Sequence, residues 1–172
     1  MIDPDRSEVG FEVRHLALSR VRGRFTRFEG TVRVSRGRVS ATGSVRVASV
    51  ETGDDRRDNY LRTDEGFFDP DHHPQMQFTA APVSLSDGGS FRLEGELTIR
   101  ATRRPLVLDV GVARPARGGR EDPRGEVVLT AVGKLKRSDF GLRFPAVGGY
   151  GDSLVGDTVG IELHLTAARA HG

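Results

Sequence analysis

Apolar and polar residues alternate along most of this chain, with almost no helical pattern between the alternating segments. In the segment 91–99, positions 91, 93, 97 and 99 are apolar and the residues between them are polar or glycine. The segment 159–165 alternates in the same way. A period of two places one face of each strand in a dry interior and the other face in water. Many such strands must bury their apolar faces against one another, which predicts a sandwich or a closed barrel.

The alternation predicts eight strands and one short helix. The strands are expected over residues 9–15, 21–34, 44–50, 75–85, 91–99, 105–113, 126–135 and 158–168, the second of them bent at Gly30. The helix is expected over residues 54–62, with Thr52 or Gly53 as its cap. Turns or loops are expected at 86–89, 114–125 and 148–152. No linker divides the chain, so we predict a single domain over residues 1–172.

Composition and charge narrow the class of protein further. The absence of cysteine excludes disulfides, thiol chemistry and cysteine-bound metals. The formal net charge is only +2, and no run of like charge indicates a nucleic-acid partner. We find neither a signal peptide nor an apolar run long enough to span a membrane. A cytoplasmic protein is therefore expected.

Three groups of residues carry a resemblance to a known family. They are residues 7–16, 21–25 and 28–30; then 57–58, 61–62, 67–69, Pro74 and Phe78; and finally 97–100, 104–105, 137–142 and 154–157. In this order they resemble the YceI family over nearly the whole chain. The resemblance implies an all-β fold, an eight-stranded antiparallel lipocalin-like barrel with a hollow apolar lumen and one or two short helices. It also implies a long polyisoprenoid lipid in that lumen, no enzymatic activity, and dimers in several members.

The inward side chains indicate a cavity independently of the resemblance. Eight strands leave room either for a side-chain core or for one small ligand. Ala131, Gly133 and Gly95 are small inward residues that favour a cavity, although a tapered solid core stays equally open on the residues alone. The side chains that we expect in the lumen are Phe11, Val13, Phe25, Phe28, Leu61, Phe67, Phe68, Met76, Phe78, Leu97, Ile99, Leu129, Phe140, Leu142 and Phe144.

Four polar residues are candidates for the end of the lumen that would hold a lipid head group. They are His15, Arg57, Asp58 and Asn59. His15 is the polar exception on an otherwise apolar inward face, and it is either a hydrogen-bonded core residue or a head-group contact. The expected partner is a polyisoprenoid or quinone-like lipid, with a homodimer as a further expectation. Storage, transport or isoprenoid-quinone metabolism are the roles that such binding would serve.

The sequence signals for a catalytic or metal-binding site are weak compared with the family resemblance. His72 and His73 are adjacent, so in an extended segment their rings point in opposite directions, and no further ligands converge on them. Asp139-Phe140-Gly141 matches the kinase magnesium motif in three letters, but the other kinase motifs are missing. We therefore expect no metal, no cofactor and no enzyme. The alternatives are a hydrolase or isomerase that acts on a prenyl lipid with His15 and Asp58, or a packed barrel that serves as a protein interaction module.

Overall fold

The computed structural model describes residues 1–16, 18–65, 67–85, 89–113, 126–144 and 155–167. The expected loops 114–125 and 148–152 lie outside the described residues, as do residues 86–88 of the expected turn and the last residue of the segment 158–168. The described residues form one antiparallel sheet of ten strands, one α-helix and three short 3-10 helices. The expectation of an all-β, antiparallel protein is confirmed.

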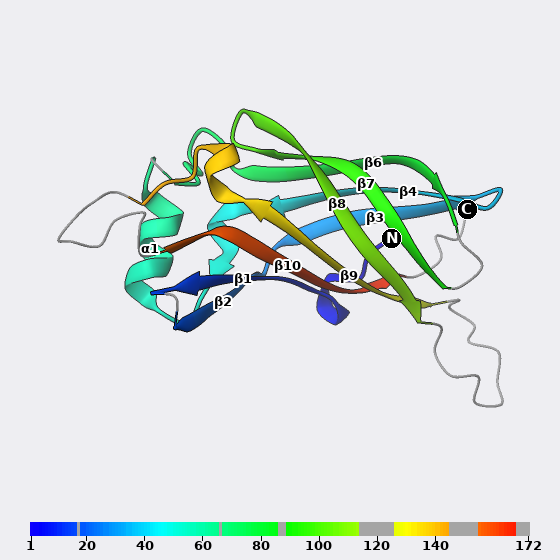
Figure 1. Ribbon diagram of the computed structural model, residues 1–172, viewed down its shortest axis with the longest axis horizontal. Helices are drawn as coiled ribbons and strands as arrows, with labels where there is room; N and C mark the ends of the chain where they lie inside the picture. Colours follow the sequence, from blue (N-terminus) through cyan, green and yellow to red (C-terminus); the bar gives the residue numbers. More distant parts are fainter. Residues whose placement is uncertain (17, 66, 86–88, 114–125, 145–154, 168–172) are drawn as a thin grey trace.

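The sheet curls around an apolar interior, and its longest strands, such as β8 and β10, run along most of the molecule (Figure 1). The strands are β1 (Glu8–His15), β2 (Ser19–Phe25), β3 (Phe28–Ser35), β4 (Arg38–Arg46), β5 (Val50–Glu51), β6 (Gln75–Ser84), β7 (Ser90–Ile99), β8 (Thr102–Ala113), β9 (Val127–Lys136) and β10 (Val155–Ala167). The helices are η1 (Pro4–Arg6), η2 (Val47–Ser49), α1 (Asp55–Thr63) and η3 (Arg137–Phe140). The strand order in the sheet is β3-β4-β6-β7-β8-β9-β10-β1-β2-β5, so the first long strand pairs with the last one.

The expected count of eight strands is wrong, and the difference lies between residues 21 and 51. The expected second strand is two strands, β2 and β3, because the chain turns a corner at Thr26 and Arg27. Here the Thr26 N–H donates to the Ser49 carbonyl, and the Arg27 carbonyl accepts from Arg46. Gly30, where a bend was expected, lies inside β3 in regular register with Gly43.

Strand β4 was missed because its alternation is faint. Ala41 and Gly43 carry little apolar surface, and the residues that alternate with them, Thr42 and Ser44, are small and polar. The expected strand over residues 44–50 is the end of β4 followed by η2 and the first residue of β5. A period of two is visible in a sequence only where inward residues are clearly larger and more apolar than their neighbours.

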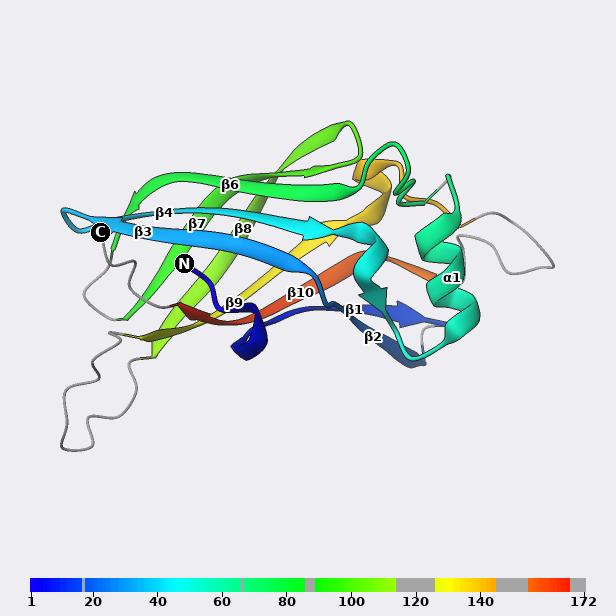
Figure 2. The same ribbon diagram turned by 180° about the vertical axis from the view of Figure 1, so that it is seen from behind.

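Helix α1 lies across one end of the curled sheet (Figures 1 and 2). It begins and ends one residue later than the expected range 54–62. The cap is Asp54 and not Thr52 or Gly53, since the Asp54 carboxylate accepts a hydrogen bond from the N–H of Arg57 at 2.9 Å. That bond satisfies one of the free N–H groups of the first turn and lowers the pKa of Asp54. Leu61, which is 4% exposed, anchors the helix in the core.

The gap between β3 and β10 is bridged by the first residues of the chain (Figure 2). The N–H of Ile2 donates to the Gly30 carbonyl of β3 at 2.9 Å, and Ile2 forms an antiparallel bridge with Ala167 of β10. The N–H of Asp3 donates to the Thr166 carbonyl at 2.8 Å. The side chain of Ile2 is buried, so the N-terminal segment closes this side of the interior.

Candidate functional site

The interior of the curled sheet holds an apolar cavity of about 280 Å³. The alternating inward side chains of the strands form its walls, and α1 with the segment that follows it covers one end. Among the charged and hydroxyl side chains of the lining, Thr52, Arg57 and Arg137 belong to this α1 end. An apolar cavity of roughly 150 Å³ stays dry and is enough to bind benzene. The cavity therefore has room for an apolar ligand of larger size.

All but one of the fifteen side chains expected in the lumen line this cavity. Those that do are Phe11, Val13, Phe25, Phe28, Leu61, Phe67, Phe68, Met76, Phe78, Leu97, Ile99, Leu129, Leu142 and Phe144. Phe140 is buried at 3% exposure in the core cluster next to the cavity and is not part of its lining. It sits on η3, one residue before Gly141, whose left-handed backbone ends that helix. The period of two does not apply to such a turn.

Several lining residues had no clear signal in the sequence. Val39 and Ala41 were missed together with the first part of β4, and Val45 lies in the expected strand 44–50 but was not assigned to the lumen. Ile2 lies in a segment with no alternation. Arg137 is charged, so apolar periodicity passes over it, although it begins the stretch 137–142 that contributes to the family resemblance.

Two glycines let aromatic rings lie directly against the cavity wall. A Cβ atom at Gly23 would overlap Cζ, the far end of the Phe11 ring on the neighbouring strand, and would lie 2.7 Å from Cε1. A Cβ atom at Gly95 would lie 2.6 Å from Cζ of Phe78 and 2.7 Å from the carbonyl oxygen of Thr79. Glycine is therefore required at both positions for the present placement of the rings.

A chain of aromatic rings crosses the α1 end of the cavity. In order of contact the rings are Phe11, Phe25, Phe68, Phe67, Phe144 and Tyr60, and the centroids of consecutive rings are 4.8 to 5.9 Å apart. These separations fall in the range that favours tilted, edge-to-face or offset-stacked aromatic pairs. Phe67 and Phe68 come from the segment after α1, so this segment gives the cavity an aromatic end wall.

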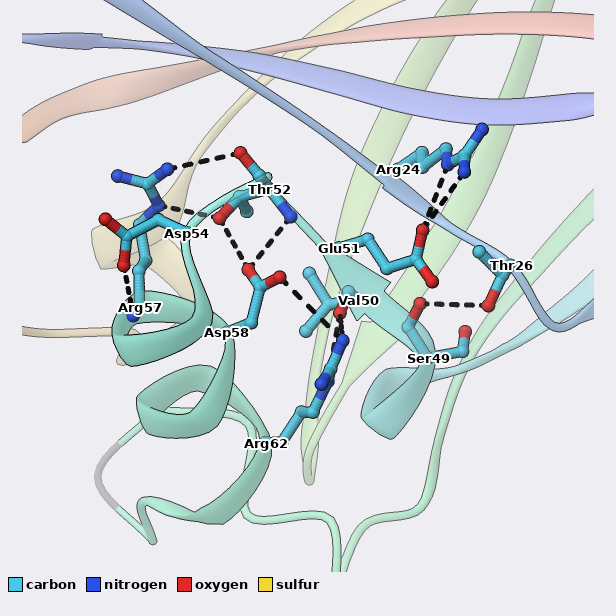
Figure 3. A network of polar contacts seen from close by, with 10 residues as sticks. All are labelled: Arg24, Thr26, Ser49, Val50, Glu51, Thr52, Asp54, Arg57, Asp58 and Arg62. Carbon is cyan, nitrogen blue, oxygen red and sulfur yellow. Dashed lines mark hydrogen bonds and ion pairs between the residues drawn. The ribbon is translucent and has the colours of Figure 1, made fainter.

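A polar network joins α1 to the end of β5 (Figure 3). Asp58 is 6% exposed and accepts hydrogen bonds from both the N–H and the hydroxyl of Thr52. The same hydroxyl accepts from Nε of Arg57 at 2.7 Å, and Nη2 of Arg57 donates to the Thr52 carbonyl at 3.2 Å. Arg62 lies 3.8 Å from the Asp58 carboxylate and donates to the Val50 carbonyl. Thr52 thus holds Arg57 at the edge of the cavity.

The four residues expected near a head group occupy different places. Arg57 lines the cavity and is half-buried. Asp58 is directed at Thr52 and Asn59 is exposed, and neither belongs to the lining. His15 is also outside the lining, because the register of β1 against β10 shifts between Val13 and His15. Such a bulge breaks the inward phase on which its placement depended. His15 and Asp58, which the hydrolase alternative would use together, therefore share no position in the cavity lining.

Arg137 is a second cation of the lining, and its donors are used within the fold. Its side chain donates to the carbonyls of Gly156 at 3.1 Å, Leu142 at 2.9 Å and Val155 at 2.9 Å. Its guanidinium carbon lies 5.4 Å from the centre of the Phe144 ring. A buried charge is tolerated only when it is hydrogen-bonded in this way. Arg137 ties η3 to the beginning of β10.

The histidine pair forms a local contact. Nδ1 of His72 lies 2.8 Å from Oδ1 of Asp69, and this hydrogen bond raises the pKa of His72 and lowers that of Asp69. Within the described ranges, no group of three or more histidine, cysteine, aspartate or glutamate side chains could hold a metal ion. No helix in the described part of the chain is long and apolar enough to cross a membrane.

A curled antiparallel sheet around an apolar cavity defines the class of lipocalin-like barrels. The model of the YceI-like domain matches residues 1–167, and the chain belongs to this family. A UPF0312 protein of Pectobacterium atrosepticum is 31% identical over 139 residues, which cover 78% of this chain and 69% of that protein. The YceI protein of Shigella flexneri is 29% identical over 140 residues, which cover 78% of this chain and 70% of that protein. The resemblance stated from the sequence is confirmed.

Solved structures share the fold. BcnA of Burkholderia cenocepacia superposes with a TM-score of 0.82 at 24% identity, over 97% of this chain and 99% of BcnA. The YceI protein of Campylobacter jejuni gives a TM-score of 0.76 at 25% identity, over 92% of this chain and 90% of that chain. A polyisoprenoid binding domain from Saccharophagus degradans gives a TM-score of 0.69 at 16% identity, over 98% of this chain and 97% of that domain.

Proposed function

We propose that this protein binds a polyisoprenoid or a similar long-chain amphiphilic lipid, with the tail of the lipid in the cavity. The observation that carries the proposal is the cavity itself, whose walls are almost entirely apolar side chains. The shared fold with the polyisoprenoid binding domain of Saccharophagus degradans supports it. Storage or transport of the lipid, or a part in isoprenoid-quinone metabolism, is the role we propose. The cytoplasmic location and the homodimer expected from the sequence stay predictions.

The affinity for a lipid depends on which environment the lipid leaves when it enters the cavity. Burying a prenyl unit of five carbons is worth about 3–4 kcal/mol relative to water, at about 0.8 kcal/mol per carbon. The natural home of such a lipid is a bilayer, however, and its transfer to an apolar lumen exchanges one apolar environment for another. Net affinity must then come from the shape of the cavity and from contacts with the head group.

We assign the head-group contact to Arg57. It is the charged side chain of α1 that borders the cavity, and Thr52 fixes its orientation through two hydrogen bonds. Its remaining terminal nitrogen, Nη1, has no hydrogen-bond partner among the described residues, and Figure 3 shows it directed away from Thr52. An arginine held in this way can receive a phosphate or carboxylate oxygen.

The first experiment asks whether a lipid is present at all. The protein is purified gently and studied by native mass spectrometry, and the organic extract of the same sample is analysed for lipids. We expect a long-chain lipid that is released on denaturation. A protein that is empty and takes up neither geranylgeraniol nor geranylgeranyl pyrophosphate would disprove the proposed function.

The second experiment tests the assignment of Arg57. We expect Arg57→Ala to weaken binding of geranylgeranyl pyrophosphate by roughly ten- to a hundredfold, since a charge-assisted hydrogen bond contributes about 1.5–3 kcal/mol. Binding of the neutral geranylgeraniol should change little. Arg56→Ala is the matched control, because Arg56 is exposed on the same helix and does not line the cavity. Equal losses for both ligands would show that Arg57 is structural.

A further inference from the structure

Two leucines stand exposed at the turn between β1 and β2. They lie between His15 and Ser19, which form the last pair of the β1–β2 ladder. Leu16 is 46% exposed and Leu18 is 95% exposed, the largest exposure among the large apolar side chains of the described residues. Single exposed apolar residues are ordinary on a protein surface, but two at the tip of one hairpin form a small protruding apolar patch.

The backbone conformation at Leu16 is unfavourable for a leucine. Leu16 has a φ of +53°, in the left-handed region that glycine or asparagine adopts more readily. The turn is held by the His15 carbonyl, which accepts from the N–H of Leu18 and from the hydroxyl of Ser19. A leucine here costs both conformational strain and exposure of apolar surface to water. Arg36 and Arg100 adopt the same backbone in the β3–β4 and β7–β8 turns. What distinguishes Leu16 is that it presents an apolar side chain to water there, next to Leu18.

Positive charge surrounds the two leucines. Arg14 and Arg20 lie directly opposite each other in the β1–β2 ladder, an arrangement of like charges that destabilises a sheet. Arg20 and Arg22 share one carboxylate, that of Glu12, at 3.2 and 2.9 Å. Arg14 is exposed and has no ion pair with any described residue. The strands of the hairpin carry four arginines against two glutamates, Glu8 and Glu12, so positive charge is in excess.

Two lysines extend the positive charge onto the neighbouring strands near the hairpin, whereas the exposed Glu162 lies two residues from Gly160 along β10, on the side away from Thr158. Gly160 of β10 pairs with Glu12 on one side and with Lys134 of β9 on the other. Lys134 and Lys136 are both exposed, and Lys136 pairs with Thr158 on the same strand β10. A surface of this kind is complementary to a negatively charged plane.

The hairpin also adjoins the cavity. Val13 lies two residues before the end of β1 and pairs with Val21, two residues after the start of β2, and both line the cavity. The β1–β2 turn lies beside α1 at the same end of the molecule in both views (Figures 1 and 2). A surface that bound this turn would therefore face the α1 end of the cavity.

We propose that the β1–β2 hairpin docks on an anionic lipid bilayer. Leu16 and Leu18 enter the boundary between head groups and acyl chains, and Arg14 and Arg20 contact the anionic head groups. A stable interface with another protein needs about 800 Å² from each partner, which a single turn does not offer. Membrane association needs only a small apolar insertion together with electrostatic attraction. The docking would serve the transfer of lipid between the bilayer and the cavity, and this role rests on the proposed function. The docking itself does not depend on that function.

The test measures binding of the protein to vesicles by flotation. The probe is a vesicle of phosphatidylcholine with roughly 30% phosphatidylglycerol, because anionic lipids attract basic segments of a protein. We expect the protein to bind these vesicles and to bind them more weakly at high salt. The double variant Leu16→Asn with Leu18→Ser should bind at least about fivefold more weakly. Arg14→Ser should bind about fivefold more weakly, which corresponds to about 1 kcal/mol for one arginine at a charged membrane surface.

A matched control separates the hairpin from general apolar exposure. Val34→Ser removes an apolar side chain of 63% exposure from β3, and vesicle binding should be unchanged. Equal loss in the Val34 variant and the double variant would overturn the proposal, as would equal binding to vesicles of pure phosphatidylcholine. Light scattering that shows a dimer lost in the double variant, with vesicle binding intact, would assign the leucines to a second copy of this chain.

The uptake of geranylgeraniol from detergent solution tests lipid binding separately from docking on a bilayer. The double variant should take it up as well as the unaltered protein does, because neither leucine lines the cavity. Vesicle binding without any uptake would disprove the lipid-binding function and leave the docking intact. Uptake without vesicle binding would disprove the docking alone.

Discussion

Individual glycines decide how much space the interior has. At Gly23 the place of a side chain is taken by the far end of the Phe11 ring, and Phe11 itself lines the cavity. At Gly95 the space is taken by the Phe78 ring and also by the backbone carbonyl of Thr79. A ring that borders a cavity can move, whereas a carbonyl in a strand cannot. The same substitution should therefore have different effects at the two positions.

We expect Gly23→Ala to push the Phe11 ring into the cavity. Binding of geranylgeraniol should fall while the melting temperature of the delipidated protein stays nearly unchanged. Gly95→Ala is the control, and overpacking against a fixed carbonyl should lower the free energy of unfolding by roughly 1–3 kcal/mol. Thermal melts and a tail-binding assay on both variants distinguish these outcomes. Equal destabilisation by the two substitutions would show that the Phe11 ring has no space to move.

Residue placement was predictable wherever a strand is regular. The period of two put Phe11 and Leu129 on the inward face, where both line the cavity. It misplaced His15, because a register shift in a strand leaves no mark in the sequence. It could not find Arg137, since a buried cation is recognised only from the carbonyls that it meets in three dimensions.

Among the elements, α1 depends most on a single buried carboxylate. Asp58 accepts from the N–H and the hydroxyl of Thr52, and Arg62 lies beside it. These contacts fix the helix against the end of β5, and through Thr52 they also fix Arg57. The helix is only nine residues long, so it is too short to be stable without such contacts.

We expect Asp58→Ala to lower the free energy of unfolding by about 1–3 kcal/mol, because it leaves the groups of Thr52 without their acceptor. Asp55→Ala is the control, since Asp55 is exposed in the first turn of the same helix. Its loss should cost about 0.3–1 kcal/mol at most, the size of a charge interaction with the helix dipole. Urea unfolding measures both variants. Equal changes would mean that the Asp58 contacts add nothing to the docking of α1.

The elements were predictable in proportion to the strength of their pattern. Helix α1 was found to within one residue, because Asp54 and the first-turn acids mark its start. Strands β7 and β9 were found from strong alternation. Strand β4 was missed, and β2 and β3 were merged, because small residues and a corner without glycine or proline give no local signal at Thr26.

For the whole molecule, the decisive question is whether the interior is hollow or merely loosely packed. Leu97 contacts both core clusters and remains only half-buried, because its side chain lines the cavity. It belongs to β7, where it pairs with Arg104 of β8 and Phe78 of β6. A larger side chain at this position would lie where we propose the lipid tail.

We expect Leu97→Trp to leave the stability of the empty protein unchanged and to weaken binding of geranylgeraniol. In a solid core the added ring would cost roughly 1–3 kcal/mol and lower the melting temperature. Thermal melts of the delipidated protein and the tail-binding assay decide between these cases. Lost stability with unchanged binding would contradict a tail-binding cavity at this position.

The pairing of β1 with β10 has a consequence for synthesis of the chain. The edge of β1 that pairs with β10 stays unpaired until β10 has been synthesised, and Val155 follows its partner His15 by 140 residues. At ~5–20 residues per second, a ribosome needs roughly seven to thirty seconds for that distance. An open strand edge pairs readily with any other strand during such an interval. Newly made chains are thus most exposed to aggregation before β10 emerges, and a chaperone that covers β1 would protect them.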